Sequence, residues 1–281
     1  MPLESPVPVD TRAMFRPVSA SLVTLLRGLP PSDWQRPTIA GTWLVRDIVA
    51  HLMDLALRRL SFHRDAMPPP PPPGPINSDR DFVAFINGLN AHWVSAARRL
   101  SPRVLTDMYE AAGRDLADWF ESRPLDGPGL FGVSWAGEQA SANWFDIGRE
   151  FTELWHHQQQ IRLAVGADPL PDPRYLHAVL AVAMRGLPHA YRNVTAEPGQ
   201  TVVLDVEGSA GGQWTLVRED DRWTLAQGVP ATETTRVRLD DDAAWKLLFN
   251  ALPADDAARA VSVTGRPDLV GPFIGARSVI V

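Results

Sequence analysis

A change of sequence pattern near residues 166–173 constrains the fold of this chain more than any other feature. Before it, apolar residues recur every three or four positions over long stretches, and after it, short strand-like runs alternate with turn residues. The segment between them, Gly166 to Pro173, contains three prolines and a glycine, and both residue types interrupt helices and strands. We therefore predict two domains, at residues 1–166 and 167–281.

The first domain is predicted to be all helical. Apolar stripes with a helical period cover residues 10–29, 43–66, 78–100, 102–121 and 141–165. Six consecutive prolines, Pro68 to Pro73, interrupt this series and form a stiff connector. Long amphipathic helices joined by loops favour a four-helix bundle.

The second domain is predicted to be a smaller α+β unit. A helix at residues 173–191 comes first, and strands follow at residues 201–206, 213–218, 223–227, 235–239 and 260–264. Helices are expected at 240–252 and 267–274, and a last strand at 278–281. Strands and helices in this mixture indicate an α+β fold.

Composition excludes several classes of function. The chain has no cysteine, which excludes disulfides, thiolate metal sites and a cysteine nucleophile. Its formal net charge of −6 gives no reason to expect a nucleic-acid partner. No signal peptide is visible at the N-terminus, and no apolar stretch approaches the ~20 residues of a membrane span. We expect a cytoplasmic protein with no membrane partner.

Three residues form a candidate metal site. Glu153 and His157 lie four positions apart in a predicted helix, so their Cβ atoms would be roughly 5–6 Å apart on one face. His51, at the edge of the apolar stripe of the helix over 43–66, is a candidate third ligand. Two imidazoles and one carboxylate leave a coordination position open, as in catalytic sites, and they suit zinc, nickel, iron or manganese.

The alternative is a favourable helical Glu–His pair without a metal. His156 should point about 100° away from His157, toward solvent.

The segments around these residues resemble two motifs of DinB-like proteins, specifically the mycothiol-dependent maleylpyruvate isomerase family. The first motif is Trp43-Leu-Val-Arg-Asp-Ile-Val-Ala-His-Leu52 and the second is Glu153-Leu-Trp-His-His157. The resemblance implies His51, Glu153 and His157 as metal ligands, with zinc as the expected ion. The family usually has an acidic residue where Gln160 stands here. The region ending in Val261-Ser-Val-Thr-Gly-Arg-Pro-Asp-Leu-Val270 resembles the family's sterol-carrier-protein-like second domain.

The resemblance also implies a reaction. Members use an external low-molecular-weight thiol, such as mycothiol, to isomerise a small electrophilic substrate or to transfer the thiol to it, and we expect that substrate to carry a carboxylate. The family's catalytic arginine lies in the second domain, where four candidates are present and none is assigned: Arg218, Arg222, Arg236 and Arg238. Two alternatives stay open. One is a non-catalytic metal-binding or small-ligand-binding regulatory protein, and the other is a metal hydrolase on the same scaffold.

Overall fold

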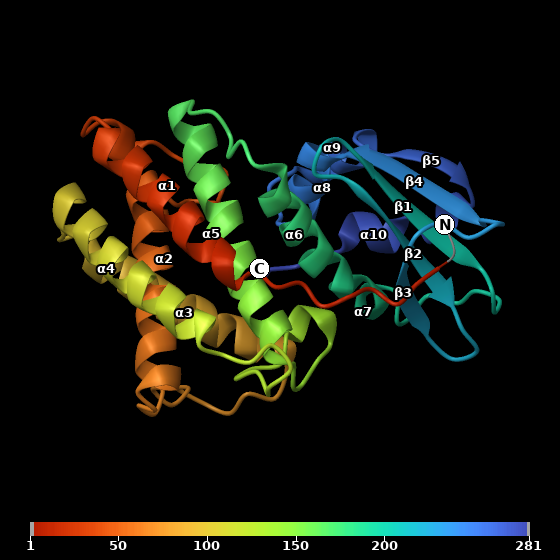
Figure 1. Cartoon of the computed structure of the whole chain (residues 1–281), viewed down its shortest axis with the longest axis horizontal. Helices are drawn as coiled ribbons and strands as arrows, with labels where there is room; N and C mark the ends of the chain where they lie inside the picture. The colour runs from red at the N-terminus through yellow and green to blue at the C-terminus, as the bar shows by residue number, and fades with distance from the viewer. Residues whose placement is uncertain (1–2, 280–281) are drawn as a thin grey trace. The chain divides into compact units, whose positions relative to one another are not determined.

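The computed structural model describes residues 3–279, which form two compact units (Figure 1). The helical unit comprises residues 11–124 and 153–171. The sheet unit comprises the described residues up to Asp10 together with 125–152 and 172–279. The long helix α5 (Asn143–Val165) begins in the sheet unit and ends in the helical unit. The predicted domains, residues 1–166 and 167–281, stay a prediction about which parts of the chain fold independently.

The helical unit is built on long amphipathic helices. Helix α4 (Pro102–Glu121) packs against α1 (Phe15–Gly28) and α2 (Val45–Arg58), and α2 also packs against α3 (Asp79–Ala97). Short 3-10 turns precede α1 and α2, at Arg12–Met14 and Asp33–Gln35. The predicted helical character of this region is confirmed, and the four-helix bundle arrangement stays a prediction.

Helix α2 departs from the predicted helix at its C-terminal end. The predicted helix over 43–66 is α-helical from Val45 to Arg58 and continues as a π-helical segment from Arg59 to Arg64. Ala66 then adopts a left-handed conformation with φ of 55°, which ends the helix before the proline run.

Five strands form one mixed sheet in the order β3-β2-β1-β4-β5. Strands β1 (Thr201–Glu207) and β4 (Thr235–Asp240) pair in parallel, and all other neighbours are antiparallel: β2 (Gly212–Arg218), β3 (Trp223–Gln227) and β5 (Ser262–Gly265). In this register Leu204 lies opposite both Trp214 and Val237, and all three side chains are buried. The predicted α+β character is therefore confirmed as a mixed sheet with helices.

Helices of the sheet unit pack on this sheet and on one another. Helix α8 (Asp241–Leu248) contacts β1, β4 and α6 (Pro173–Ala183), while α7 (Leu187–Ala190) contacts β3 and α10 (Gly271–Gly275). Helix α9 (Ala254–Arg259) was not predicted because its six residues are too few to show an apolar period. The strand predicted at 278–281 lies partly outside the described residues, and Ser278 and Val279 form a bend.

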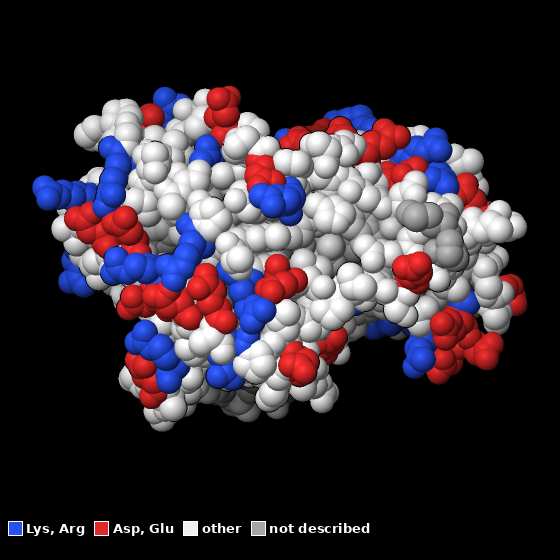
Figure 2. Space-filling view, viewed as in Figure 1, with Lys and Arg blue, Asp and Glu red and all other residues white. Residues whose placement is uncertain are grey.

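Charged side chains of both signs are mixed on the surface of the helical unit. Ion pairs connect α1 to α4, including Arg16 with Glu121 and Arg27 with Glu110. On the face drawn in Figure 2, basic and acidic groups accordingly alternate over α1 and α4. Among residues 3–279, no helix combines the length and hydropathy that a membrane span requires. The cytoplasmic location stays a prediction.

Candidate metal centre

Helix α2 carries His51 in its second turn, after a firmly held N-terminus. The backbone N–H of Leu44 donates to Asp47 Oδ2 over 3.1 Å, which caps the helix. The Asp47 carboxylate also accepts two hydrogen bonds from the Arg98 guanidinium, at 3.1 and 2.9 Å. A buried apolar face then fixes the rotation of the helix: Val45, Ile48, Val49, Leu52. His51 is thereby held at a buried position, 4% exposed.

Helix α5 supplies the other two side chains. Glu153 and His157 are one turn apart and lie on the same face of the helix. His157 is 6% exposed. The His157 Nε2 atom is 3.3 Å from Glu153 Oε2, so the pair predicted from spacing is formed.

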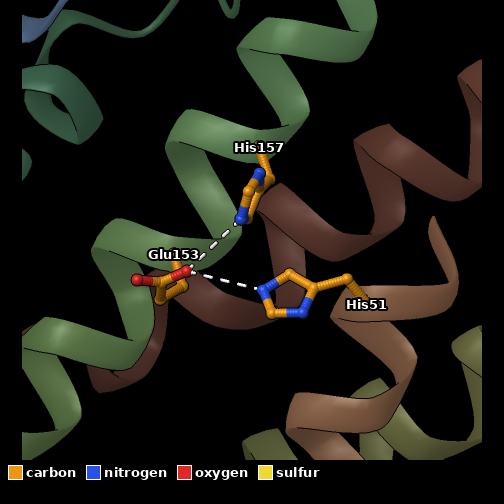
Figure 3. Close-up of side chains that lie close together, drawn as sticks. All are labelled: His51, Glu153 and His157. Carbon is orange, nitrogen blue, oxygen red and sulfur yellow. Dashed lines mark ion pairs between the residues drawn. The ribbon is translucent and has the colours of Figure 1, made fainter. Parts of the chain in front are cut away.

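The structure brings the three predicted residues together (Figure 3). The Glu153 carboxylate lies between the two imidazoles, with Oε2 3.8 Å from His51 Nε2 and 3.3 Å from His157 Nε2. The possible ligand atoms of all three residues lie within 4.8 Å of one another. Among the described residues, this is the one group of at least three His, Cys, Asp or Glu side chains with such spacing.

Burial and hydrogen bonding set the charges of the group. Burial lowers the pKa of His51 to about 4, because desolvation disfavours the imidazolium more than Glu153 favours it. Burial alone would raise the pKa of Glu153, but the hydrogen bonds with His157 and His51 outweigh it and hold that pKa well below its usual value. At neutral pH, His51 is therefore a neutral imidazole and Glu153 a carboxylate.

Gln160 orients the His157 ring. Gln160 follows His157 by three residues in α5, and its Oε1 atom lies 2.7 Å from His157 Nδ1. An amide oxygen only accepts, so this contact places a proton of His157 on Nδ1. Gln160 thus contacts the ring nitrogen that does not face Glu153, as a carboxylate often does for a metal-binding histidine.

The donor set fits a divalent cation. Two donors that each lie about 2.0–2.1 Å from a tetrahedral ion are about 3.3 Å apart, which matches the 3.3 Å between His157 Nε2 and Glu153 Oε2. His51 Nε2, at 3.8 Å from the same oxygen, needs a shift of about half an ångström. A neutral imidazole and a carboxylate are the protonation states that bind a metal.

Sequence reasoning was wrong about His156, which is buried at 1% exposure instead of facing solvent. The reason is that this part of α5 is buried on every side, as its consecutive buried residues show: Leu154 to Ile161. A rotation of about 100° around such a helix leads to another packed face. Sequence reasoning also did not find that the Trp43 indole packs on the imidazoles of His51 and His157.

The candidate arginines of the second domain lie in the sheet unit. Arg236 and Arg238 are neighbours on one face of β4, and both contact Asp205 Oδ2, at 2.6 and 3.3 Å. Arg236 also pairs with Glu233. Arg218, at the end of β2, donates to the backbone oxygen of Asp220. These contacts assign none of them to catalysis.

Comparisons with known proteins give a family for the N-terminal part of the chain and a fold for most of its length. The family described as the mycothiol maleylpyruvate isomerase N-terminal domain matches residues 15–162. A crystal structure of a mycothiol-dependent maleylpyruvate isomerase is similar with a TM-score of 0.52 and 14% identity, covering 90% of this chain and 91% of that one. A histidine-to-alanine variant of that enzyme gives the same values. No curated protein matches. At such low identity the structural likeness concerns the fold, and the sterol-carrier-protein-like character of the second domain stays a prediction.

Proposed function

Because the chain belongs to the mycothiol maleylpyruvate isomerase N-terminal domain family, we propose that it is a metal-dependent enzyme that uses a low-molecular-weight thiol. The substrate is a small electrophile, and the reaction is isomerisation or thiol transfer. One observation carries the proposal: the buried group of His51, Glu153 and His157, whose ligand atoms lie within 4.8 Å of one another.

The residues of the group are suited to holding a dication. Glu153 provides a negative charge and His51 a neutral nitrogen, because their pKa values are both lowered. Three protein ligands leave an exchangeable position, which a catalytic site needs and a closed structural site lacks. A divalent ion, with zinc as our expectation, would lower the pKa of a bound thiol or polarise a substrate carbonyl.

The thiol has to come from outside the protein, since the chain contains no cysteine. The proposed chemistry is addition of the thiolate sulfur to an activated carbon–carbon double bond. The new C–S bond converts the double bond to a single bond, and the displaced electron pair moves onto the activating carbonyl. The adduct can then rotate about the single bond. Expulsion of the same thiolate then restores the double bond in the other geometry. If a proton taken from water adds to the other carbon instead, the C–S bond is kept and the reaction is thiol transfer.

Metal analysis of protein purified without a histidine tag tests the first half of the proposal. We expect close to one equivalent of a divalent metal in the natural chain and less than a tenth in His51→Ala. The control is His92→Ala, which removes an exposed histidine of α3. Less than a tenth of an equivalent in the natural chain, with no effect of His51→Ala, would refute the metal centre.

Activity assays test the second half. The metal-loaded protein is mixed with mycothiol and maleylpyruvate, or with other cis-configured, carboxylate-bearing electrophiles, and isomer ratios are followed. Turnover that requires the thiol supports the proposal. Hydrolysis of an ester or amide without added thiol would indicate a metal hydrolase, and a metal-loaded chain without turnover would indicate a regulatory or binding protein.

A further inference from the structure

The loop that leads into α2 holds Trp43 in a fixed position. Pro37 and Leu44 form an isolated antiparallel bridge, which closes the loop at its base. The carbonyl of Trp43 accepts from the Thr38 backbone N–H at 3.0 Å and from its hydroxyl at 2.8 Å. Gly41, with φ of 60°, makes the tight turn between them, a conformation that glycine adopts without steric cost. Trp43 is therefore placed by the backbone as well as by its own packing.

The Trp43 indole lies on both imidazoles of the candidate metal centre. Its ring centroid is 4.8 Å from that of His51 and 5.9 Å from that of His157. The two imidazoles are 4.9 Å apart at an interplanar angle of 80°. Aromatic rings at such separations are in packing contact, so the indole forms one wall of the group.

The two histidines differ in what fixes their rings. His157 Nδ1 lies 2.7 Å from Gln160 Oε1, and this hydrogen bond fixes the orientation of the ring. His51 Nδ1 is buried and has no hydrogen-bond partner in the part of the chain that the structure describes. Metal-binding histidines usually use their second nitrogen to hold the ring in place. For His51 that support is missing, and its ring packs between the Trp43 indole, at 4.8 Å, and the His157 ring, at 4.9 Å, which Gln160 already holds.

We infer that Trp43 is the positioning residue of His51: its indole does for this imidazole by packing what Gln160 does for His157 by hydrogen bonding. The expected consequence of this packing is a higher metal affinity, and that consequence rests on the proposed metal centre. A ring held in one orientation loses less conformational entropy when it binds an ion. The packing contact itself exists without any metal and can be tested without one.

Replacing Trp43 tests the inference on two levels. In metal-free protein labelled with ¹⁵N-histidine, the ring resonances of His51 and His157 are assigned with His51→Ala and His157→Ala. We expect Trp43→Ala to shift and broaden the His51 signals, while His157 keeps its Nδ1-protonated form. In a Co²⁺ titration followed by visible absorption, Trp43→Ala should lower the affinity about 10–100-fold, the usual effect of losing an outer partner of a metal ligand.

Two further variants separate positioning from general damage. Trp43→Phe keeps a ring and should stay within about threefold of the natural affinity, whereas Trp43→Leu, apolar without a ring, should behave like Trp43→Ala. The matched control is Trp119→Ala, since Trp119 is a partly buried tryptophan that stacks on a different imidazole, His63, at 6.4 Å. This control should leave Co²⁺ binding unchanged.

The spectra and the Co²⁺ affinities test the positioning role of Trp43 and the metal centre separately. An unchanged His51 spectrum in Trp43→Ala, or an equal disturbance of His51 and His157, would overturn the positioning role. Equal affinities of Trp43→Phe and Trp43→Leu would also overturn it, because the ring would then be irrelevant. If the natural chain binds no Co²⁺, the proposed function fails, and the metal-free spectra still decide whether Trp43 orients His51.

Discussion

The helical unit and the region of the sheet (residues 172–279) differ in which polar side chains they bury. Among the described residues of the sheet region, the buried polar side chains are hydroxyls: Thr201, Thr215, Thr235 and Ser278. The helical unit buries imidazoles, carboxylates, a guanidinium and amides, several of them next to one another in α2 and α5.

The energetic cost of the two kinds of burial is unequal. A buried hydroxyl needs one partner, and Thr215 finds it in the Gly228 carbonyl at 2.6 Å, as Ser278 does in the Ala183 carbonyl at 3.0 Å. A buried ionisable group costs far more unless it is paired or changes its protonation state. His51 changes its protonation state: its pKa falls to about 4, so the buried imidazole is neutral at neutral pH. Two of these costly buried groups, His51 and His157, belong to the candidate metal centre, whereas the sheet region from residue 172 to 279 buries none among its described residues.

The largest effect is expected from Glu153→Gln. This change keeps the shape of the side chain and removes the one negative charge between the two imidazoles. We expect metal affinity to fall by more than about 100-fold, because losing a ligand costs more than losing an outer partner. Competition with a metal chelator measures it. Glu110→Gln, at an exposed position on α4, is the control and should bind as the natural chain does.

Acid should destabilise the metal-free helical unit through His51. The pKa of His51 is about 4 in the folded protein, and about 6.5 when unfolded. Between these values the unfolded chain binds more protons, so the free energy of unfolding falls as pH is lowered from about 6.5 and is not affected above it. From pH 7 to 4.5 the loss should be about 2–3 kcal/mol.

Urea unfolding of the metal-free natural chain and of His51→Ala at several pH values checks this. The difference between the two proteins should narrow or reverse as pH falls, because the variant has no imidazole to protonate. Parallel pH profiles for the two proteins would contradict the buried neutral state of His51.

Gln160→Leu should have an intermediate effect on the metal centre. It removes the hydrogen bond that holds His157 Nδ1 and should lower metal affinity about 10-fold. Gln160→Glu, which restores an acceptor, should recover the affinity or exceed it. An affinity in Gln160→Leu equal to that of the natural chain would show that packing alone orients His157.

The smallest effect is expected in the sheet. Thr215→Val keeps the side-chain volume and removes the hydrogen bond to Gly228, which should lower the free energy of unfolding by about 1–2 kcal/mol. Metal content should not change. A loss of metal in this variant would show that the two units are coupled and would remove the contrast between them.

Much of the fold could be predicted because its periodicities are local. Pro102 to Glu121 is a helix from the first predicted residue to the last, with Ser101 accepting from the Val104 N–H as its cap. Strand Trp223–Gln227 also has the predicted bounds. The π-helical segment after Arg58 and the short helix α9 were not predicted, since neither has a distinct apolar period.

The sequence by itself determined which residue types could meet: a Glu–His pair at helical spacing, a second histidine on another helix, and no cysteine to compete with them. Only the tertiary structure decided that these side chains do meet, that His156 is buried, and that Trp43 covers the imidazoles. The physical reason is that spacing along one helix fixes directions within that helix alone. Contacts between α2, α5 and the loop before α2 depend on how their faces pack. Burial by these elements lowers the pKa of His51, and the contacts with the two imidazoles lower the pKa of Glu153.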